Sequence, residues 1–212
     1  MDALSVIWAS RDDDYAAGVN FRLIRSIESV MAAASKLRME LDLIVVDWNS
    51  PRDRKLTDFL RARHVSGVRV IEVPSRLCQS FETTSTKEFL EYPAKNVGIR
   101  RATTDHVLII NPDIVVSKQL LSACVSRPHL SDSFLRADRT DFSHGLWRKP
   151  KLLRRHIRHG ISEEAPITVY RQGIMRRFPK SEALPDEEIL EDLLIGPIGG
   201  SNNHFLLGMH TN

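Results

Sequence analysis

The fold of this chain is indicated most clearly by the run His106-Val107-Leu108-Ile109-Ile110-Asn111-Pro112-Asp113. The run up to Ile110 predicts a buried strand, and the three residues after it predict a polar turn. In open α/β folds the carboxyl ends of the strands form the edge at which ligands bind. The turn therefore brings the carboxylate of Asp113 to a candidate ligand site, although Asn, Pro and Asp also favour turns for purely local hydrogen-bonding reasons.

Three further strand-like runs precede this stretch, and helical patterns separate them. We expect strands at residues 4–9, 41–46 and 68–74, and helices at about 21–39, around 56–60 and at about 94–102. Residues 75–86 form a polar stretch before the last of these helices. Alternating strands and helices predict an α/β fold with a Rossmann-like, mostly parallel sheet and flanking helices.

Polar segments follow three of these strands, at residues 10–14, 47–51 and 111–113. Right-handed crossovers between parallel strands place their carboxyl ends on one edge of the sheet. We therefore expect the three segments to meet there and to form a ligand crevice.

The signals weaken after Ser117, and we expect this part to be irregular. A helix is predicted at 118–125, short strands at 134–137, 167–170 and 205–207, and an acidic amphipathic helix at 185–194. No internal repeat separates this part from the rest. Residues 1–212 are therefore interpreted as a single domain with two halves, 1–120 and 121–212.

The composition is that of a soluble globular protein with a core, with 42% hydrophobic and 27% charged residues. The net charge of +3 can favour a phosphorylated ligand but is too small to indicate nucleic acid. Cys78 and Cys124 lie far apart and form no disulfide framework, which favours a reducing compartment. No signal peptide and no membrane-spanning stretch is recognisable, so we expect a cytoplasmic or cytoplasm-facing protein.

Four motifs occur in a definite order along the chain. They are Ser-Arg-Asp-Asp at 10–13, Ile-Val-Val-Asp-Trp-Asn-Ser-Pro at 44–51, Ala-Lys-Asn-Val-Gly-Ile-Arg-Arg-Ala at 94–102 and Ile-Asn-Pro-Asp at 110–113. Their order and spacing resemble family-2-type glycosyltransferases of the GT-A fold, in the nucleotide-diphosphosugar transferase superfamily. The resemblance covers residues 4–120 and, more faintly, 201–207.

This resemblance implies an enzyme of hexosyltransferase type that transfers a sugar from a nucleotide-diphosphosugar donor to an unknown acceptor. Residues 1–120 would then form the nucleotide-sugar-binding half and residues 121–212 the acceptor-side half. The same resemblance also allows for a transferase that has lost its activity through truncation of the acceptor-side half.

The resemblance also implies a divalent metal, Mn²⁺ or Mg²⁺, that bridges the donor phosphates. Asp113 corresponds to the last acid of the family's Asp-x-Asp motif, which reaches the metal. Asn111 stands where the first acid often is, and it can hydrogen-bond a ribose hydroxyl but brings no charge. The remaining metal ligands can come from substrate phosphates, so this departure does not exclude a metal.

Asp47 corresponds to an acid that lies beside the nucleotide base or ribose in such enzymes. A carboxylate at this position can accept a hydrogen bond from a base N–H. The alternative is a structural role, in which Asp47 caps its own turn through Asn49 and Ser50.

Ser10, Arg11 and Asp12 correspond to the loop that lies along the nucleotide. Arg11 can pair with phosphate, because a guanidinium matches phosphate oxygens bidentately. The alternative for Arg11 is a surface ion pair with one of the acids at 12–14.

Lys95 and Asn96 are expected to open the helix at 94–102, where free N–H groups and the helix dipole favour an anion. Lys95 either faces the ligand or is solvated, and Asn96 either contacts the donor or caps the helix. Gly98 is expected to allow close packing of this helix on the sheet.

The general base of an inverting transfer is not identified. In the family it follows a Gly-Asp-Phe-type strand, where this chain has Asn203 and His204 and then stops at Asn212. We therefore expect either a truncated catalytic core or a module that has lost turnover. The candidate bases are Asp186, Glu187 and Glu188, which the dipole of their own predicted helix explains equally well.

Two other functions remain open at this point. The chain could be a non-catalytic nucleotide-sugar-binding module. It could also be a basic interaction domain for nucleic acid or anionic lipid, through the basic run at 148–158. A solvated face with apolar residues packed beneath it is the other explanation for that run.

Overall fold

The computed structural model describes residues 3–13, 18–82, 89–125, 134–137, 167–171, 174–178 and 206–209. The strands are β1 (Ala3–Ser10), β2 (Glu40–Trp48), β3 (Val68–Val73), β4 (His106–Ile109), β5 (Phe134–Ala137), β6 (Ile167–Arg171), β7 (Ile174–Phe178) and β8 (Leu206–Met209). The helices are α1 (Val19–Leu37), α2 (Leu56–Ala62), α3 (Ser75–Glu82), α4 (Glu91–Ile99) and α5 (Lys118–Val125). Among the described residues, no helix has both the length and the apolar character needed to cross a bilayer.

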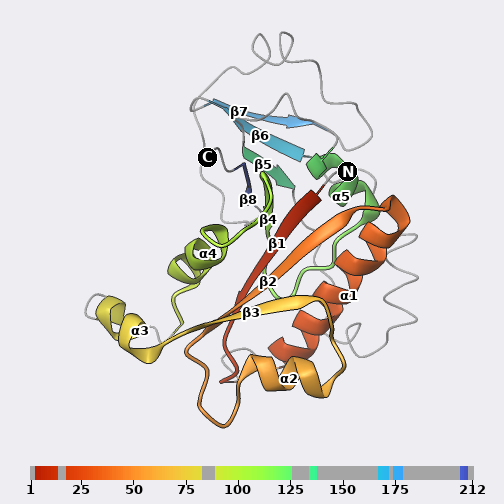
Figure 1. The fold of residues 1–212 in the computed structure, drawn as a ribbon. Helices are drawn as coiled ribbons and strands as arrows, with labels where there is room; N and C mark the ends of the chain where they lie inside the picture. The colour runs from red at the N-terminus through yellow and green to blue at the C-terminus, as the bar shows by residue number, and fades with distance from the viewer. Residues whose placement is uncertain are drawn as a thin grey trace.

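The strands form one eight-stranded sheet in the order β3-β2-β1-β4-β8-β5-β6-β7 (Figure 1). The neighbours among β3, β2, β1 and β4 are parallel. Beyond β4 the sheet continues through antiparallel pairs. The predicted α/β class is confirmed, with its parallel sheet formed by the first four strands.

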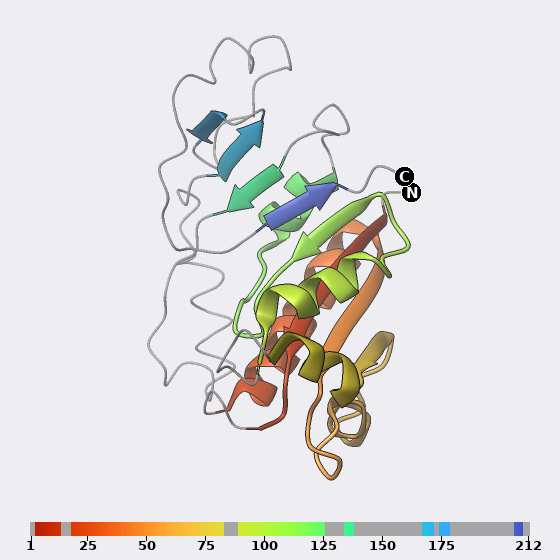
Figure 2. The same ribbon diagram turned by 90° about the vertical axis from the view of Figure 1, so that its left-hand side faces the viewer.

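The two faces of the parallel sheet pack against different helices, because successive side chains of a strand point to opposite faces. On one face Leu4, Val6 and Trp8 of β1 share a core cluster with α1 and α5. On the other face Ile7 and Ala9 share a second cluster with α4. Figures 1 and 2 show α1 and α4 on opposite sides of the sheet. Burial on both faces explains why β1 and β2 are almost continuously apolar.

Two helices differ from the sequence-based expectation. Helix α3 forms inside the stretch at 75–86 that was interpreted only as polar, with Cys78 fully buried against the sheet. Helix α4 begins at Glu91 rather than at Ala94. Pro93 lies in the first turn of this helix, where its missing N–H is not needed. Strand β7 was also not predicted.

Gly98 permits the close packing of α4 on the sheet, as expected. A Cβ atom at this position would overlap Cγ2 of Ile7 and lie 3.2 Å from Cγ2 of Val46. A larger residue here requires Ile7 or α4 itself to shift.

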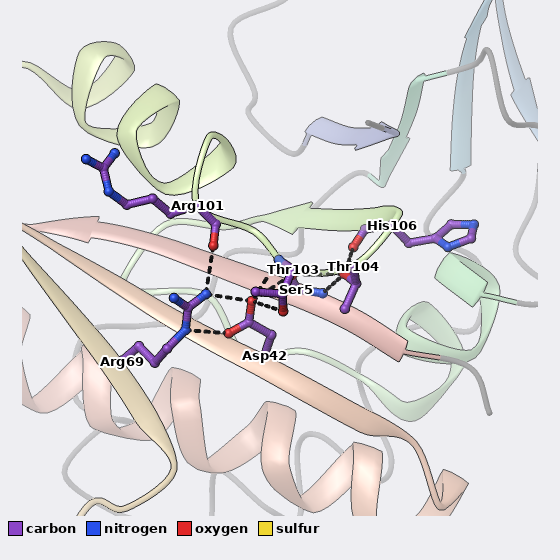
Figure 3. A network of polar contacts seen from close by, with 7 residues as sticks. All are labelled: Ser5, Asp42, Arg69, Arg101, Thr103, Thr104 and His106. Carbon is purple, nitrogen blue, oxygen red and sulfur yellow. Dashed lines mark hydrogen bonds and ion pairs between the residues drawn. The ribbon is translucent and has the colours of Figure 1, made fainter. Parts of the chain in front are cut away.

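A network of polar contacts joins the amino ends of the parallel strands (Figure 3). Both carboxylate oxygens of Asp42 accept hydrogen bonds from the Arg69 guanidinium, each at 2.8 Å. Oδ2 of Asp42 also accepts from the Thr103 hydroxyl at 2.8 Å and from Ser5 Oγ at 3.1 Å. Partial burial alone would raise the pKa of Asp42, but the hydrogen bonds from Arg69 and Thr103 outweigh it and hold the pKa below the ordinary 3.8. The network therefore ties β1, β2, β3 and the α4–β4 connection together through one ionised carboxylate.

Candidate functional site

The carboxyl ends of the four parallel strands lie at one edge of the sheet. Ser10 is the register partner of Asp47, and Trp48 is the partner of Val73. On the other side of β1, the Ile110 N–H donates to the Ile7 carbonyl at 3.0 Å. The predicted meeting of the polar strand ends at a single edge is therefore confirmed for the residues that the structure describes there.

A cleft of about 510 Å³ lies at this edge, over the ends of β1, β2 and β3. Its charged and amide-bearing lining consists of Arg11, Asn49, Arg52, Lys55 and Glu72. Three of these side chains are cationic and one is anionic. The cleft therefore favours a ligand that carries negative charge.

Two loops that are distant in sequence form one wall of the cleft. The Asp12 N–H donates to Ser50 Oγ at 2.8 Å, and Arg54 Nη2 donates to Asp12 Oδ1 at 2.8 Å. Asp12 is only 5% exposed. It therefore fixes the loop after β1 to the loop after β2, and its carboxylate is largely closed to a ligand.

Asp47 fixes the loop after β2 through hydrogen bonds. Its Oδ1 accepts hydrogen bonds from both the N–H and the hydroxyl of Ser50, and its Oδ2 accepts from the Leu56 N–H at 3.1 Å, at the start of α2. Burial raises the pKa of the Asp47 carboxyl, and the hydrogen bonds from Ser50 and Leu56 offset this only in part. Asp47 is fully buried. These contacts favour the turn-capping alternative over direct contact with a nucleotide base.

Ser10 and Arg11 lie next to each other at the end of β1 in different environments. Ser10 is fully buried, and its hydroxyl has no hydrogen-bond partner among the residues that the structure describes. Arg11 lines the cleft and forms an ion pair between its Nε and Asp13 Oδ2 at 2.6 Å. The predicted alternative of an ion pair with a neighbouring acid is thus present, and it leaves Arg11 in the cleft wall.

Lys95 lies at the end of β4, on the opposite side of β1 from the cleft. Its ammonium group is 2.5 Å from Glu91 Oε1 and 2.8 Å from Asn111 Oδ1. The residue is only 8% exposed. The alternative of a solvated lysine is therefore wrong. The expectation that Lys95 opens its helix is also wrong, because α4 already begins at Glu91.

Asn96 does not cap α4. The residue before the first helical turn is Leu90, and it provides no side-chain cap. Asn96 is exposed in the middle of the helix. The capping alternative for Asn96 is wrong, because Pro93 can occupy the first turn and so allows the helix to start earlier.

Asp113 is exposed in the turn after β4, which is closed by a 3.1 Å hydrogen bond from the Ile114 N–H to the Asn111 carbonyl. No described residue donates to its carboxylate or pairs with it. Three potential metal-ligating side chains do not come together anywhere in the described part of the chain. One accessible carboxylate nevertheless fits Mn²⁺ or Mg²⁺ chemistry in which substrate phosphates supply most of the oxygens. Any such ion would depend on the bound substrate for its affinity.

Several residues with predicted roles lie outside the described residues. They are the candidate bases Asp186, Glu187 and Glu188, the Asn203–His204 pair and the basic run at 148–158. Their roles stay predictions.

Several residues of the site were not predicted from the sequence, namely Arg52, Arg54, Lys55, Glu72 and Glu91. A signal was present for three of them, since Arg52, Arg54 and Lys55 form a cationic cluster directly after the second motif. Glu91 stands four residues before Lys95, the spacing of an ion pair on a helix. Only Glu72, which extends from β3 into the cleft, had no local signal.

The sequence matches no protein-family model and no curated protein. Among solved structures, residues 1–349 of S. aureus TarS are 19% identical with a TM-score of 0.40, over 63% of this chain and 34% of the TarS chain. The complex of TarS with UDP-GlcNAc is 18% identical with the same TM-score. The galactosyltransferase LgtC in complex with donor and acceptor sugar analogs is 17% identical with a TM-score of 0.37, over 64% of this chain and 46% of LgtC. This chain therefore spans about a third of the TarS chain and under half of LgtC.

Proposed function

We propose that this chain is a glycosyltransferase domain of GT-A type that binds a nucleotide-diphosphosugar donor at the carboxyl edge of its parallel sheet. The observation that carries the proposal is the placement of two polar subsites at one edge. The first is the cation-lined cleft over β1, β2 and β3. The second is the end of β4, with Lys95, Asn111 and the exposed carboxylate of Asp113.

The two subsites suit an extended ligand. Neighbouring strands lie about 4.8 Å apart, so the ends of β2 and β4 are separated by roughly 10 Å across β1. We assign the nucleoside to the cleft, beside Arg11, and the diphosphate to the end of β4. Asp12, Asp47 and Ser10 support the cleft wall in this proposal, and Asn96 flanks the second subsite on α4.

The proposed reaction is a single displacement with inversion. The acceptor hydroxyl oxygen forms a bond to the anomeric carbon while the bond from that carbon to the diphosphate breaks, and a general base takes the hydroxyl proton. Cationic side chains at the edge oppose the negative charge that develops on the departing diphosphate. The base is proposed among Asp186, Glu187 and Glu188, and the acceptor is unknown.

A Mn²⁺ or Mg²⁺ ion is part of this proposal, with Asp113 as the residue that would hold it. When bound, it would supply further positive charge to the leaving diphosphate. Lys95 cannot take its place as a ligand, since an ammonium group only donates hydrogen bonds.

Thermal unfolding with nucleotide diphosphates tests donor binding. UDP is the first choice because the TarS structure contains UDP-GlcNAc, and GDP, CDP and ADP complete the panel. A nucleotide at 100 times its Kd stabilises the folded protein by about 2.7 kcal/mol, which is a shift of several degrees in Tm. If none of the four nucleotides shifts Tm, with or without Mn²⁺, the proposed function is wrong.

The metal is tested separately with Asp113→Ala and with Asp58→Ala as control. Asp58 is an equally charged residue on α2 whose side chain is 71% exposed. We expect Mn²⁺ to increase the shift caused by the nucleotide in the wild type and in the Asp58 variant but not in Asp113→Ala. An equal effect of Mn²⁺ in all three proteins would exclude Asp113 as the metal residue and leave donor binding intact.

A second assay separates turnover from binding. Release of nucleotide diphosphate from its sugar donor, measured with added acceptors, supports the transferase. Donor binding without release over many hours supports the non-catalytic module instead.

A further inference from the structure

The amide of Asn111 has only one possible orientation in this structure. Lys95 Nζ lies 2.8 Å from the side-chain atom of Asn111 that faces it. An ammonium group has three donors and no acceptor, so that atom must be the amide oxygen and not the nitrogen. The usual uncertainty about which way an asparagine amide is turned is therefore removed by the chemistry of its partner.

This orientation leaves the other end of the amide for a ligand. The two N–H groups of Asn111 Nδ2 have no acceptor among the described residues, and the side chain is half-buried at the end of β4. A group in this state recognises an atom that accepts hydrogen bonds. Its oxygen faces the Lys95 ammonium, and this positive charge disfavours a cation at the same oxygen.

The charges around Lys95 agree with this assignment. Glu91 lies 2.5 Å from the ammonium and already supplies the counter-charge. A carboxylate at position 111 is therefore not needed to neutralise the charge of Lys95, and the neutral amide of Asn111 suffices there. The ammonium beside Asn111 also repels a second cation at that position.

We propose that Lys95 is a positioning residue that turns the Asn111 amide, so that Asn111 donates a hydrogen bond to an oxygen of the bound nucleotide. The recognised atom is either a phosphate oxygen or a ribose hydroxyl, which share the ability to accept. This inference rests on the proposed function. It adds that recognition at position 111 is by donation and does not involve a metal ion.

The test uses two changes of Asn111. Asn111→Asp keeps the shape of the side chain and its contact with Lys95 but offers acceptors alone, and Asn111→Leu removes both functions. Lys36→Met is the matched control, because it lowers the net charge by one as Asn111→Asp does and lies exposed near the end of α1. The ligand is the nucleotide diphosphate that stabilises the wild type most, with EDTA present.

We expect Asn111→Asp and Asn111→Leu to weaken nucleotide binding by about tenfold to a hundredfold if the acceptor is a phosphate oxygen, and by about threefold to tenfold if it is a ribose hydroxyl, the effect of one lost hydrogen bond. Lys36→Met should bind as the wild type does. If Asn111→Asp binds the nucleotide in EDTA as tightly as the wild type, the inference is overturned while the proposed function stands.

A double-mutant cycle tests the positioning role of Lys95. Lys95→Met should weaken binding in the wild type but cause little further loss in the Asn111→Leu background, because Lys95 acts through Asn111. Losses that simply add would mean that Lys95 contacts the ligand independently, which contradicts a positioning role. If the wild type binds no nucleotide at all, the proposed function fails and this inference fails with it.

Pyrophosphate and the free nucleoside distinguish the two possible acceptors. Weaker binding of pyrophosphate to Asn111→Leu assigns the contact to a phosphate oxygen. Weaker binding of the nucleoside alone assigns it to the ribose. Either result supports donation by Asn111, and unchanged binding of both ligands contradicts it.

Discussion

The polar residues at the carboxyl edge of the sheet differ in what they can contact. Asp12 and Asp47 are closed to solvent and hold parts of the chain to each other. Asp113 and Arg52 are exposed. A ligand therefore meets a small part of the polar edge, and the buried acids act by fixing the loops that the ligand touches.

The sequence identified which residues come to the carboxyl edge of the sheet. It did not show which of them form hydrogen bonds within the protein and which are open to a ligand. Asp47 and Asp113 both follow apolar strands and look alike in the sequence. Their difference arises because Ser50 and the start of α2 reach Asp47, whereas no described residue reaches Asp113. The pattern of apolar and polar residues around an acid contains no information about its hydrogen-bond donors, since these depend on the path of the loop that follows.

The two cysteines are predicted to be unreactive in the folded protein. Both are buried, and burial raises the pKa of the Cys124 thiol to about 12. Because the thiolate is the nucleophile, Cys124 should not react with a maleimide at pH 7 to 8. Mass spectrometry of a Cys78→Ala variant measures this thiol alone, and labelling in native buffer as fast as in urea would contradict the prediction.

The start of helix α2 depends on a residue of another element. The helix has no side-chain cap of its own, and its first N–H donates to Asp47 on β2. The loop between β2 and α2 is held by the same carboxylate through Ser50. One buried acid therefore sets both the shape of a cleft wall and the start of a helix.

Asp47→Ala should destabilise the protein by about 2 kcal/mol, because the backbone N–H groups of Ser50 and Leu56 lose their acceptor. Hydrogen exchange should accelerate most in residues 50–60. Asp53→Ala, an exposed acid in the same loop, is the control and should change stability by less than about 0.5 kcal/mol. Equal effects of the two substitutions would show that Asp47 does not support α2.

Element boundaries were predicted less well than element types. The strands β1 to β4 and helix α1 lie where their apolar patterns placed them. Helix α3 was missed because its helical pattern rests on few apolar residues, of which Cys78 is fully buried. The start of α4 was predicted at Ala94, but the helix begins at Glu91, since Pro93 is tolerated in a first turn.

Polar contacts at the amino ends of the parallel strands join the same strands whose carboxyl ends form the candidate site. The Asp42 carboxylate reaches β1, β3 and the connection before β4 (Figure 3). Its partners are distant in the sequence: Arg69 is 27 positions away, Ser5 is 37 positions away and Thr103 is 61 positions away. The sequence gives no indication of this network, since none of its members forms a local motif.

The network predicts a specific acid sensitivity. The pKa of Asp42 is held below 3.8 in the folded protein, so the unfolded chain takes up the proton first as the pH falls. The contribution of Asp42 is therefore complete above 3.8 and decreases as the pH drops through its folded pKa.

Asp42→Asn should lower the free energy of unfolding by about 1–2 kcal/mol at pH 7. This difference from the wild type should shrink below pH 3.8, where the wild type loses the same contribution. Urea unfolding between pH 2 and 7 measures it, with Asp105→Asn as the control because Asp105 is exposed in the same connection. A difference that stays constant across the whole pH range would contradict the role assigned to Asp42.

The order of the sheet has a consequence for how the chain folds during synthesis. Strand β8, from residues 206–209, lies between β4 and β5. The four parallel strands can therefore assemble early, but β4 keeps an unpaired edge until a much later segment has been made. An open strand edge can pair with another chain, so aggregation at this stage is the expected failure of slow or interrupted synthesis.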